Sequence, residues 1–137
     1  MKAHIANFLF LIAFAFISCT STGQSDETES TLRVVDVEEA ISLLEKEEIV
    51  LIDVRTPAEV SSGYIEGALH WNYHNWDALV ANAEQLDKTK AVMVYCKAGG
   101  RSGKTASYLK ERGFEKVYDI RGGMNEWLAQ NKPVTKD

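Results

Sequence analysis

Residues 91–113 read AVMVYCKAGGRSGKTASYLKERG, and this stretch decides how the chain is expected to fold. Its first five residues, 91–95, are apolar without alternation, which predicts a strand covered on both faces. A cysteine and a glycine-rich turn follow, and residues 102–112 predict a helix that Gly113 closes. A buried strand that leads through a short loop into a helix is typical of parallel α/β sheets.

The rest of the chain repeats this alternation of short apolar strands and helices. Asp36 with Glu39, and Thr56 with Pro57 and Glu59, are typical helix starts. Strands are predicted at 32–35, 49–52, 68–71 and 117–120, and helices at 36–47, 57–62, 77–86 and around 124–128. The prediction is an α/β fold: an open parallel β-sheet with helices on both faces.

The N-terminal segment has the pattern of an export signal. Residues 8–17 form an apolar run of ten, too short for the roughly 20 residues that span a bilayer. The sequence Phe16-Ile17-Ser18-Cys19 resembles a bacterial lipobox, with Phe16 where the usual residue is leucine. That resemblance implies a signal peptide at 1–18, a lipid on Cys19 and a protein anchored to a membrane of the cell envelope or periplasm. The alternative is an ordinary signal peptide in which Cys19 is incidental.

Residues 19–31 are then a polar, acidic tether, and the globular domain covers 32–137. The chain has 15 Lys and Arg against 20 Asp and Glu, a net charge of −5 with no basic cluster, which argues against a nucleic-acid partner. Its two cysteines are Cys19 and Cys96. With Cys19 lipidated, Cys96 has no disulfide partner and no cysteine-based metal site. A monomer is the default expectation.

The loop after the central strand favours an ionised cysteine. Gly99 and Gly100 allow backbone N–H groups to turn toward one centre, and the helix that begins near Arg101 and Ser102 adds its free amides. Lys97 and Arg101 add positive charge. Such surroundings lower a thiol pKa from about 8.5 to roughly 3.5–7.5, so Cys96 is a candidate nucleophile. The alternative is a buried structural cysteine.

Three stretches carry a resemblance to a known family. They are LIDVRTPAE at 51–59, GYIEGA at 63–68, and the cysteine loop from Tyr95 to Ser102 together with RGGM at 121–124 and Trp127. From about Leu32 to Val134 the chain resembles a single-domain rhodanese, a thiosulfate sulfurtransferase-type module. Tyr64 stands where that family often has histidine, and Lys97 where it often has arginine.

The resemblance implies a rhodanese-like fold and a sulfurtransferase that works without a cofactor. Cys96 would take a sulfane sulfur from a small sulfur-containing anion or a protein persulfide, and cyanide or a thiol would remove it. The loop Lys97, Ala98, Gly99, Gly100, Arg101 and Ser102 would stabilise the sulfur anion, with Lys97 a candidate to bind the donor. Arg101 would orient the loop or contact substrate. Asp53 and Arg55 would brace the loop through charged hydrogen bonds, or form a structural ion pair.

Two rival functions stay open. Dual-specificity phosphatases also follow a strand-end cysteine with a loop, but five residues separate their cysteine and arginine, against four between Cys96 and Arg101. The shorter loop disfavours phosphatase or arsenate-reductase chemistry. The second rival is a non-catalytic or redox-sensing module that binds partners. For the cluster His70, Trp71, His74 and Trp76, packing is favoured over a metal site, and no metal is predicted.

Overall fold

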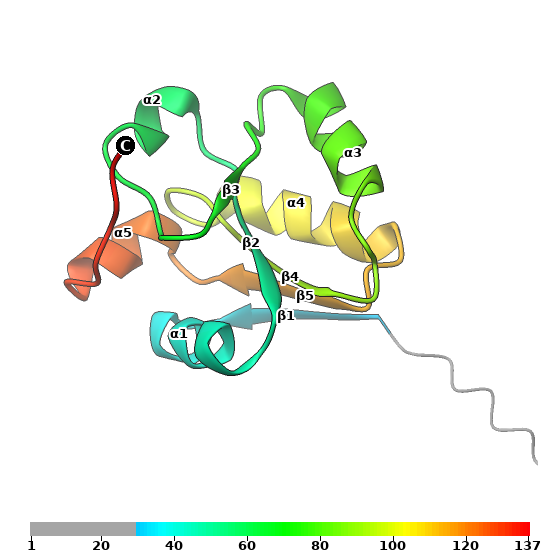
Figure 1. Ribbon diagram of the computed structural model, residues 1–137, viewed down its shortest axis with the longest axis horizontal. Coiled ribbons are helices and arrows are strands. Elements are labelled where there is room, and N and C mark those ends of the chain that lie inside the picture. The colour runs from blue at the N-terminus through cyan, green and yellow to red at the C-terminus, as the bar shows by residue number, and fades with distance from the viewer. Residues whose placement is uncertain (1–29) are drawn as a thin grey trace, which may run out of the picture.

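A computed structural model describes residues 30–137; Cys19, the predicted signal peptide at 1–18 and most of the tether lie outside these residues. The fold is one five-stranded sheet, all parallel, in the order β1-β5-β4-β2-β3 (Figure 1). The strands are β1 (Thr31–Val35), β2 (Ile49–Asp53), β3 (Leu69–His70), β4 (Ala91–Tyr95) and β5 (Lys116–Ile120). The helices are α1 (Val37–Lys46), α2 (Pro57–Val60), α3 (Trp76–Glu84), α4 (Gly100–Glu111) and α5 (Gly123–Ala129). The predicted α/β class is confirmed.

The predicted helix starts at Asp36 and Thr56 are confirmed in atomic detail. The Asp36 carboxylate accepts a hydrogen bond from the Glu39 amide at 2.8 Å. Thr56 and Glu59 form a complete capping box, with Pro57 as the first helical residue. Several boundaries differ from the prediction by one or two residues: α2 ends at Val60, β3 is only Leu69–His70, and α3 covers Trp76–Glu84. The start of α4 lies at Gly100 and not at Ser102, because Gly99 takes a left-handed φ of +108° and turns the chain directly into the helix.

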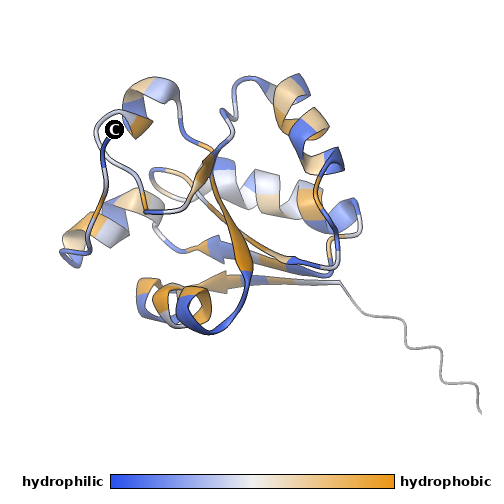
Figure 2. Cartoon of the chain, viewed as in Figure 1, coloured by the Kyte–Doolittle hydropathy of each residue, from blue (hydrophilic) through white to orange (hydrophobic). Residues whose placement is uncertain are grey.

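Two apolar layers lie on the two faces of the sheet, and β4 contributes to both. Met93 and Tyr95 pack with residues of α1 and α5, whereas Val92, Val94 and Cys96 pack with residues of α3 and α4. Figure 2 shows the apolar strands between helices whose outer sides are polar. All five residues of β4 are buried, as the unbroken apolar run predicts. The cysteine therefore leaves the sheet on the α3 and α4 side.

The strand register brings two predicted site segments to one edge of the sheet. Asp53 at the end of β2 pairs with Tyr95 at the end of β4, so the residues that follow both strands emerge side by side. The starts of α2 and α4 follow at the same edge (Figure 1). Within residues 30–137, no helix combines the length and apolarity needed to cross a membrane.

Candidate active site

The Cys96 sulfur lies where β4 ends and the loop to α4 begins. The residue is 1% exposed, and the Gly99 amide donates a hydrogen bond to Sγ at 3.0 Å. The positive φ of Gly99 aims this amide back at the sulfur, a conformation that other residues rarely adopt. The strand end, the turn and the helix start thus place one side chain against several backbone donors.

These surroundings favour the thiolate. Burial alone raises the pKa of the Cys96 thiol, but the polar groups around it, the Ser102 hydroxyl and the Ser102, Gly99 and Ala98 amides, outweigh that effect. The pKa of the thiol is therefore held below its ordinary value. The N-terminus of α4, a twelve-residue helix, points its unpaired amides at the same atom.

The remaining loop residues divide into exposed and buried ones. Lys97, Ala98 and Gly100 are exposed, Arg101 is partly buried and Ser102 is fully buried. The Ser102 hydroxyl donates to the Gly99 carbonyl at 3.3 Å. An incoming molecule therefore meets the Lys97 and Ala98 side of the loop, while Ser102 faces the interior.

The start of α5 holds the loop from behind. The Met124 amide donates to the Cys96 carbonyl at 2.8 Å, and the Asn125 amide donates to the Lys97 carbonyl at 2.9 Å. Gly123 permits this contact, because a Cβ at that position would lie 2.3 Å from the Cys96 carbonyl oxygen. Gly123 thus has a definite role: it lets a second backbone approach the cysteine loop.

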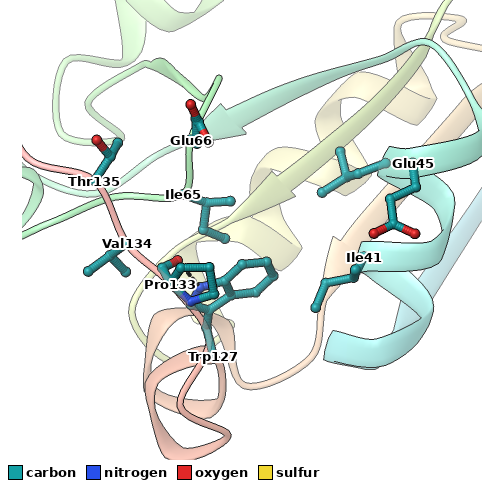
Figure 3. Close-up of a pocket in the computed structure, with 9 residues that line it drawn as sticks. Ile41, Glu45, Ile65, Glu66, Trp127, Pro133, Val134 and Thr135 are labelled. Carbon is teal, nitrogen blue, oxygen red and sulfur yellow. Dashed lines mark hydrogen bonds between the residues drawn. The ribbon is translucent and has the colours of Figure 1, made fainter.

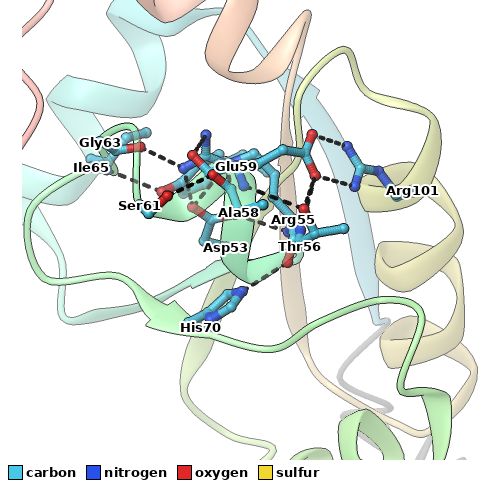
Figure 4. A network of polar contacts seen from close by, with 11 residues as sticks. Asp53, Arg55, Thr56, Ala58, Glu59, Ser61, Gly63, Ile65, His70 and Arg101 are labelled. Carbon is cyan, nitrogen blue, oxygen red and sulfur yellow. Dashed lines mark hydrogen bonds and ion pairs between the residues drawn. The ribbon is translucent and has the colours of Figure 1, made fainter.

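Arg101 is engaged by a residue of α2, as Figure 4 shows. Its two terminal nitrogens donate to the two Glu59 oxygens at 2.7 Å each, a bidentate ion pair. Glu59 also accepts from the Thr56 amide and hydroxyl, both at 2.9 Å. The Arg101 hydrogen bond and, less strongly, those of Thr56 hold the pKa of Glu59 far below its ordinary value, against the effect of burial. This pair ties the first turn of α4 to α2.

Asp53 and Arg55 form a buried pair on the other side of α2. They are 1% and 4% exposed, and Arg55 donates to Asp53 at 2.6–3.0 Å. Arg55 also donates to the Gly63 carbonyl at 2.8 Å and the Glu59 carbonyl at 3.3 Å. In the described part of the chain none of its hydrogen bonds reaches residues 96–102. The pair fixes α2, and α2 meets the loop through the Glu59 carboxylate.

Of the predicted histidine and tryptophan cluster only Trp71 is buried, whereas His70, His74 and Trp76 are exposed. Trp71 is buried, and His70 Nε2 lies 2.8 Å from the Arg55 carbonyl. Trp76 packs edge-on against Tyr73 and Tyr108. Tyr64 donates to the Asp137 carboxylate at 2.5 Å. Among residues 30–137, no three His, Cys, Asp or Glu side chains gather as metal ligands.

One hollow lies away from the cysteine. It measures about 490 Å³ between α1, α5 and the C-terminal segment, and none of residues 96–102 lines it (Figure 3). A smaller hollow of about 200 Å³ is lined by Asp53, Tyr64, His70 and Asp137, among others. Neither hollow is lined by residues 96–102, and Cys96 itself is buried.

Sequence reasoning did not identify two residues that support the loop, nor a buried acid beside α4. Glu59 stood out only as a helix-capping residue, and its partner Arg101 lies 42 positions away. Gly123 was part of a recognised pattern without an assigned contact. Asp119 carried a signal that went unused: it is the only acidic residue in the strand sequence KVYDI of β5, and it is buried.

Comparison with known proteins finds one matching family model and several relatives that are similar in sequence. The rhodanese-like domain model matches residues 36–130. A sulfurtransferase of Allochromatium vinosum is 33% identical over 67% of this chain and 83% of the relative. The thiosulfate sulfurtransferase GlpE of Glaesserella parasuis is 31% identical over 77% of this chain and 95% of that protein.

Solved structures are similar over most of the described residues. A rhodanese-related protein of Thermoplasma volcanium superposes with a TM-score of 0.68 at 23% identity, covering 77% of this chain and 99% of its own. A Rhodopseudomonas palustris protein of unknown function, described as a possible tyrosine phosphatase, gives a TM-score of 0.66 at 25% identity, covering 80% and 89%. The first likeness establishes the fold.

Proposed function

This chain belongs to the rhodanese-like domain family, and from that membership we propose that it is a sulfurtransferase that carries a sulfane sulfur as a persulfide on Cys96. The observation that carries the proposal is the contact of the Gly99 amide with Cys96 Sγ at 3.0 Å, in a loop that lowers the pKa of this thiol. The sulfurtransferases similar to it in sequence support the same reaction class.

The first half-reaction loads the cysteine. The Cys96 thiolate attacks the sulfane sulfur of a donor such as thiosulfate; the new S–S bond forms as the donor's own S–S bond breaks, and sulfite leaves with the bonding electron pair. One negative charge stays on the outer sulfur of the persulfide. Amides that stabilise the thiolate also stand near this new anion, so the loop supports the charge before and after the transfer.

The second half-reaction removes the outer sulfur from the Cys96 persulfide. A thiophilic acceptor, cyanide or a thiolate, attacks the outer sulfur and takes it, and the electron pair of the broken S–S bond returns to Cys96 as thiolate. The cycle is balanced without any cofactor. Because Lys97, Ala98 and Gly100 are exposed while Cys96 is buried, we propose that small anions and protein-bound persulfides approach the sulfur from the Lys97 and Ala98 side.

Positive charge beside the loop is proposed to guide the donor. Lys97 is exposed next to Cys96, so its ammonium is free to attract a dianion such as thiosulfate. Arg101, by contrast, is held in the Glu59 pair, and its proposed role is to orient the first turn of α4. Asp53 and Arg55 are proposed to act on the loop indirectly: Arg55 holds α2, and Glu59 of α2 holds Arg101.

The test is a cyanide assay that measures thiocyanate with thiosulfate or polysulfide as donor. The wild type should turn over, Cys96→Ser should be inactive, and Lys97→Ala should raise KM for thiosulfate about threefold or more. Lys110→Ala, which removes an exposed lysine from the last turn of α4, is the matched control. No turnover with either donor, or hydrolysis of p-nitrophenyl phosphate that depends on Cys96, would contradict the proposal and favour a binding module or a phosphatase.

We also propose that the domain is a monomer on a membrane tether, with Cys19 as the lipidated residue. Only the sequence pattern around Cys19 supports the anchor. Metabolic labelling with an alkyne fatty acid should tag the full chain and not Cys19→Ser, and light scattering should give the mass of one copy. Unlabelled wild-type protein in the soluble fraction would contradict the anchor.

A further inference from the structure

The hollow between α1, α5 and the C-terminal segment 132–137 has apolar walls (Figure 3). Its volume of about 490 Å³ lies within the roughly 300–1,000 Å³ that is usual for ligand sites. Six of its nine lining residues are apolar: Ile41, Leu44, Ile65, Trp127, Pro133 and Val134. Apolar walls that open to water favour a ligand that removes water from them.

The walls of this hollow are fastened to one another by hydrogen bonds and an ion pair. The Trp127 indole N–H donates to the Pro133 carbonyl at 2.8 Å. Tyr64 and Thr135 exchange two backbone hydrogen bonds, at 3.0 and 2.9 Å. Lys132 forms an ion pair with α1. The C-terminal segment is thus held to α5, to Tyr64 and to α1, so a ligand meets a preformed site and does not have to order its walls.

Two carboxylates stand at the rim of the hollow without a counter-charge. Glu45 of α1 and Glu66 are exposed, and they lie on opposite sides of the hollow in Figure 3. Neither forms an ion pair with another of residues 30–137. No lysine, arginine or histidine of this part of the chain lines the hollow, and the nearby Lys132 is engaged by Glu38. The hollow therefore combines apolar walls with two separate negative charges.

This combination defines the chemistry of the occupant. An apolar group is needed to cover the walls, and a cation is needed on each side to face each carboxylate. A small molecule with one ammonium group would leave one of the two carboxylates without a counter-charge. A peptide segment in which lysine or arginine stands on both sides of bulky apolar residues meets all three requirements. Residues 20–29 of this chain are acidic and have no large apolar side chain, so they do not fit.

We propose that this hollow is a docking site for a partner protein, which inserts a segment of basic–apolar–basic sequence between α1 and α5. None of residues 96–102 lines the hollow, so a docked partner leaves the cysteine loop free to react. The hollow is nevertheless built on the frame of that loop. Trp127 belongs to α5, whose first amides donate to the loop, and the Ile65 amide donates to the hydroxyl of Tyr95 at 3.1 Å, one residue before Cys96. The docking itself does not depend on the chemistry at Cys96.

The experiment is a peptide titration of the full ¹⁵N-labelled protein, followed through the indole N–H resonance of Trp127. The probe is the hexapeptide GKLLKG, acetylated and amidated at its ends. GKSSKG lacks the apolar residues, and GELLEG reverses the charges. GKLLKG should shift the Trp127 resonance with saturation and bind at least about tenfold more tightly than either control peptide. The indole resonance of Trp76, which is exposed on α3, should stay in place.

The three peptides are compared on unaltered protein, so no variant has to fold for this test. An unmoved Trp127 resonance with GKLLKG would overturn the proposal. Equal binding of GKSSKG would mean that the charges act without the apolar walls, and equal binding of GELLEG would mean that the carboxylates have no part in recognition. Either result would also overturn it.

Variants of the two glutamates test where the cations bind. Glu45→Gln and Glu66→Gln should each weaken GKLLKG binding about threefold, and the double variant about tenfold. Both positions are exposed, so glutamine there should leave the fold intact. Glu111→Gln, which removes an exposed carboxylate from the far end of α4, is the matched control and should bind as the wild type does. Unchanged affinity in the double variant would overturn the proposal.

A second copy of the chain is the rival occupant. In that case the Trp127 resonance would move on dilution of the protein alone, and the proposal of a basic partner segment would be overturned. Because none of these measurements uses a sulfur donor, loss of sulfur transfer with intact peptide binding would count against the proposed function alone.

Discussion

Replacing Gly123 by alanine should disrupt the cysteine loop from behind. The new Cβ would stand 2.3 Å from the Cys96 carbonyl oxygen, 2.9 Å from its carbonyl carbon and 3.0 Å from the Lys97 carbonyl oxygen. All three atoms belong to the backbone, so no flexible side chain can move aside. The loop and the start of α5 must separate, which weakens the hydrogen bonds from the Met124 and Asn125 amides.

The size of the effect has two parts. Gly123 has a φ of +54°, and an alanine there costs about 1–2 kcal/mol for its left-handed backbone. The overlap with the loop adds about 1–3 kcal/mol, the usual cost of an overpacked buried site. Gly113→Ala isolates the first part, because Gly113 has a φ of +89° and, among the described residues, only its chain neighbours would come within 4 Å of an added Cβ. Gly123→Ala should therefore destabilise the fold by about 2–5 kcal/mol, against about 1–2 kcal/mol for Gly113→Ala.

The assay combines urea unfolding of both variants with the iodoacetamide rate of Cys96 in the folded protein. Gly123→Ala should slow alkylation at neutral pH, because displaced amides no longer hold the pKa of the thiol down. Gly113→Ala lies at the opposite end of α4 and should leave that rate unchanged. Equal destabilisation by the two substitutions, with equal thiol reactivity, would refute the idea that α5 positions the loop.

Three further outcomes follow from the same contacts. Glu59→Gln removes the bidentate partner of Arg101 and should slow persulfide formation several-fold, while costing only about 1 kcal/mol in urea unfolding because both side chains are about a quarter exposed. Because the pKa of Glu59 is lowered in the folded protein, the carboxylate stabilises the fold fully at every pH above its ordinary pKa. The destabilisation caused by Glu59→Gln should therefore be constant from pH 6 to 9. The contribution of Asp119 to stability changes with pH in the opposite direction, because its pKa of about 6 lies above the ordinary value of about 3.9. The free energy of unfolding of the wild type should therefore fall by up to about 3 kcal/mol between pH 4 and 7. Asp119→Asn should abolish this pH dependence in unfolding experiments. Ser102→Ala should raise the apparent alkylation pKa of Cys96 by about one unit. A wild-type stability that does not change between pH 4 and 7 would contradict the role given to Asp119, and an unchanged alkylation pKa would contradict that given to Ser102.

The fold could be predicted because each helix and strand has a recognisable local sequence pattern. The unbroken apolar run at 91–95 indicates burial on both faces, and the Thr56-Pro57 start is read from capping chemistry alone. The boundary of α4 was missed by two residues, because glycine has low helix propensity and nothing local shows that Gly100 adopts helical angles.

The sequence predicted the cysteine loop at the centre of the site but not the contacts that hold this loop in place. The strand-end cysteine with its glycine loop is contiguous, so its amides could be foreseen as donors. The contacts of Glu59 with Arg101, of Gly123 with the Cys96 carbonyl, and of Asp119 with the underside of α4 join residues far apart in sequence. Such pairings depend on strand order and register, which local sequence patterns do not encode.

The most direct test of sulfur transfer is the intact mass of the purified protein after brief exposure to thiosulfate, compared with Cys96→Ser treated in the same way. The account predicts a gain of one sulfur atom that cyanide removes and that the variant lacks. An unchanged mass, with a Cys96 thiol that iodoacetamide still alkylates, would contradict it.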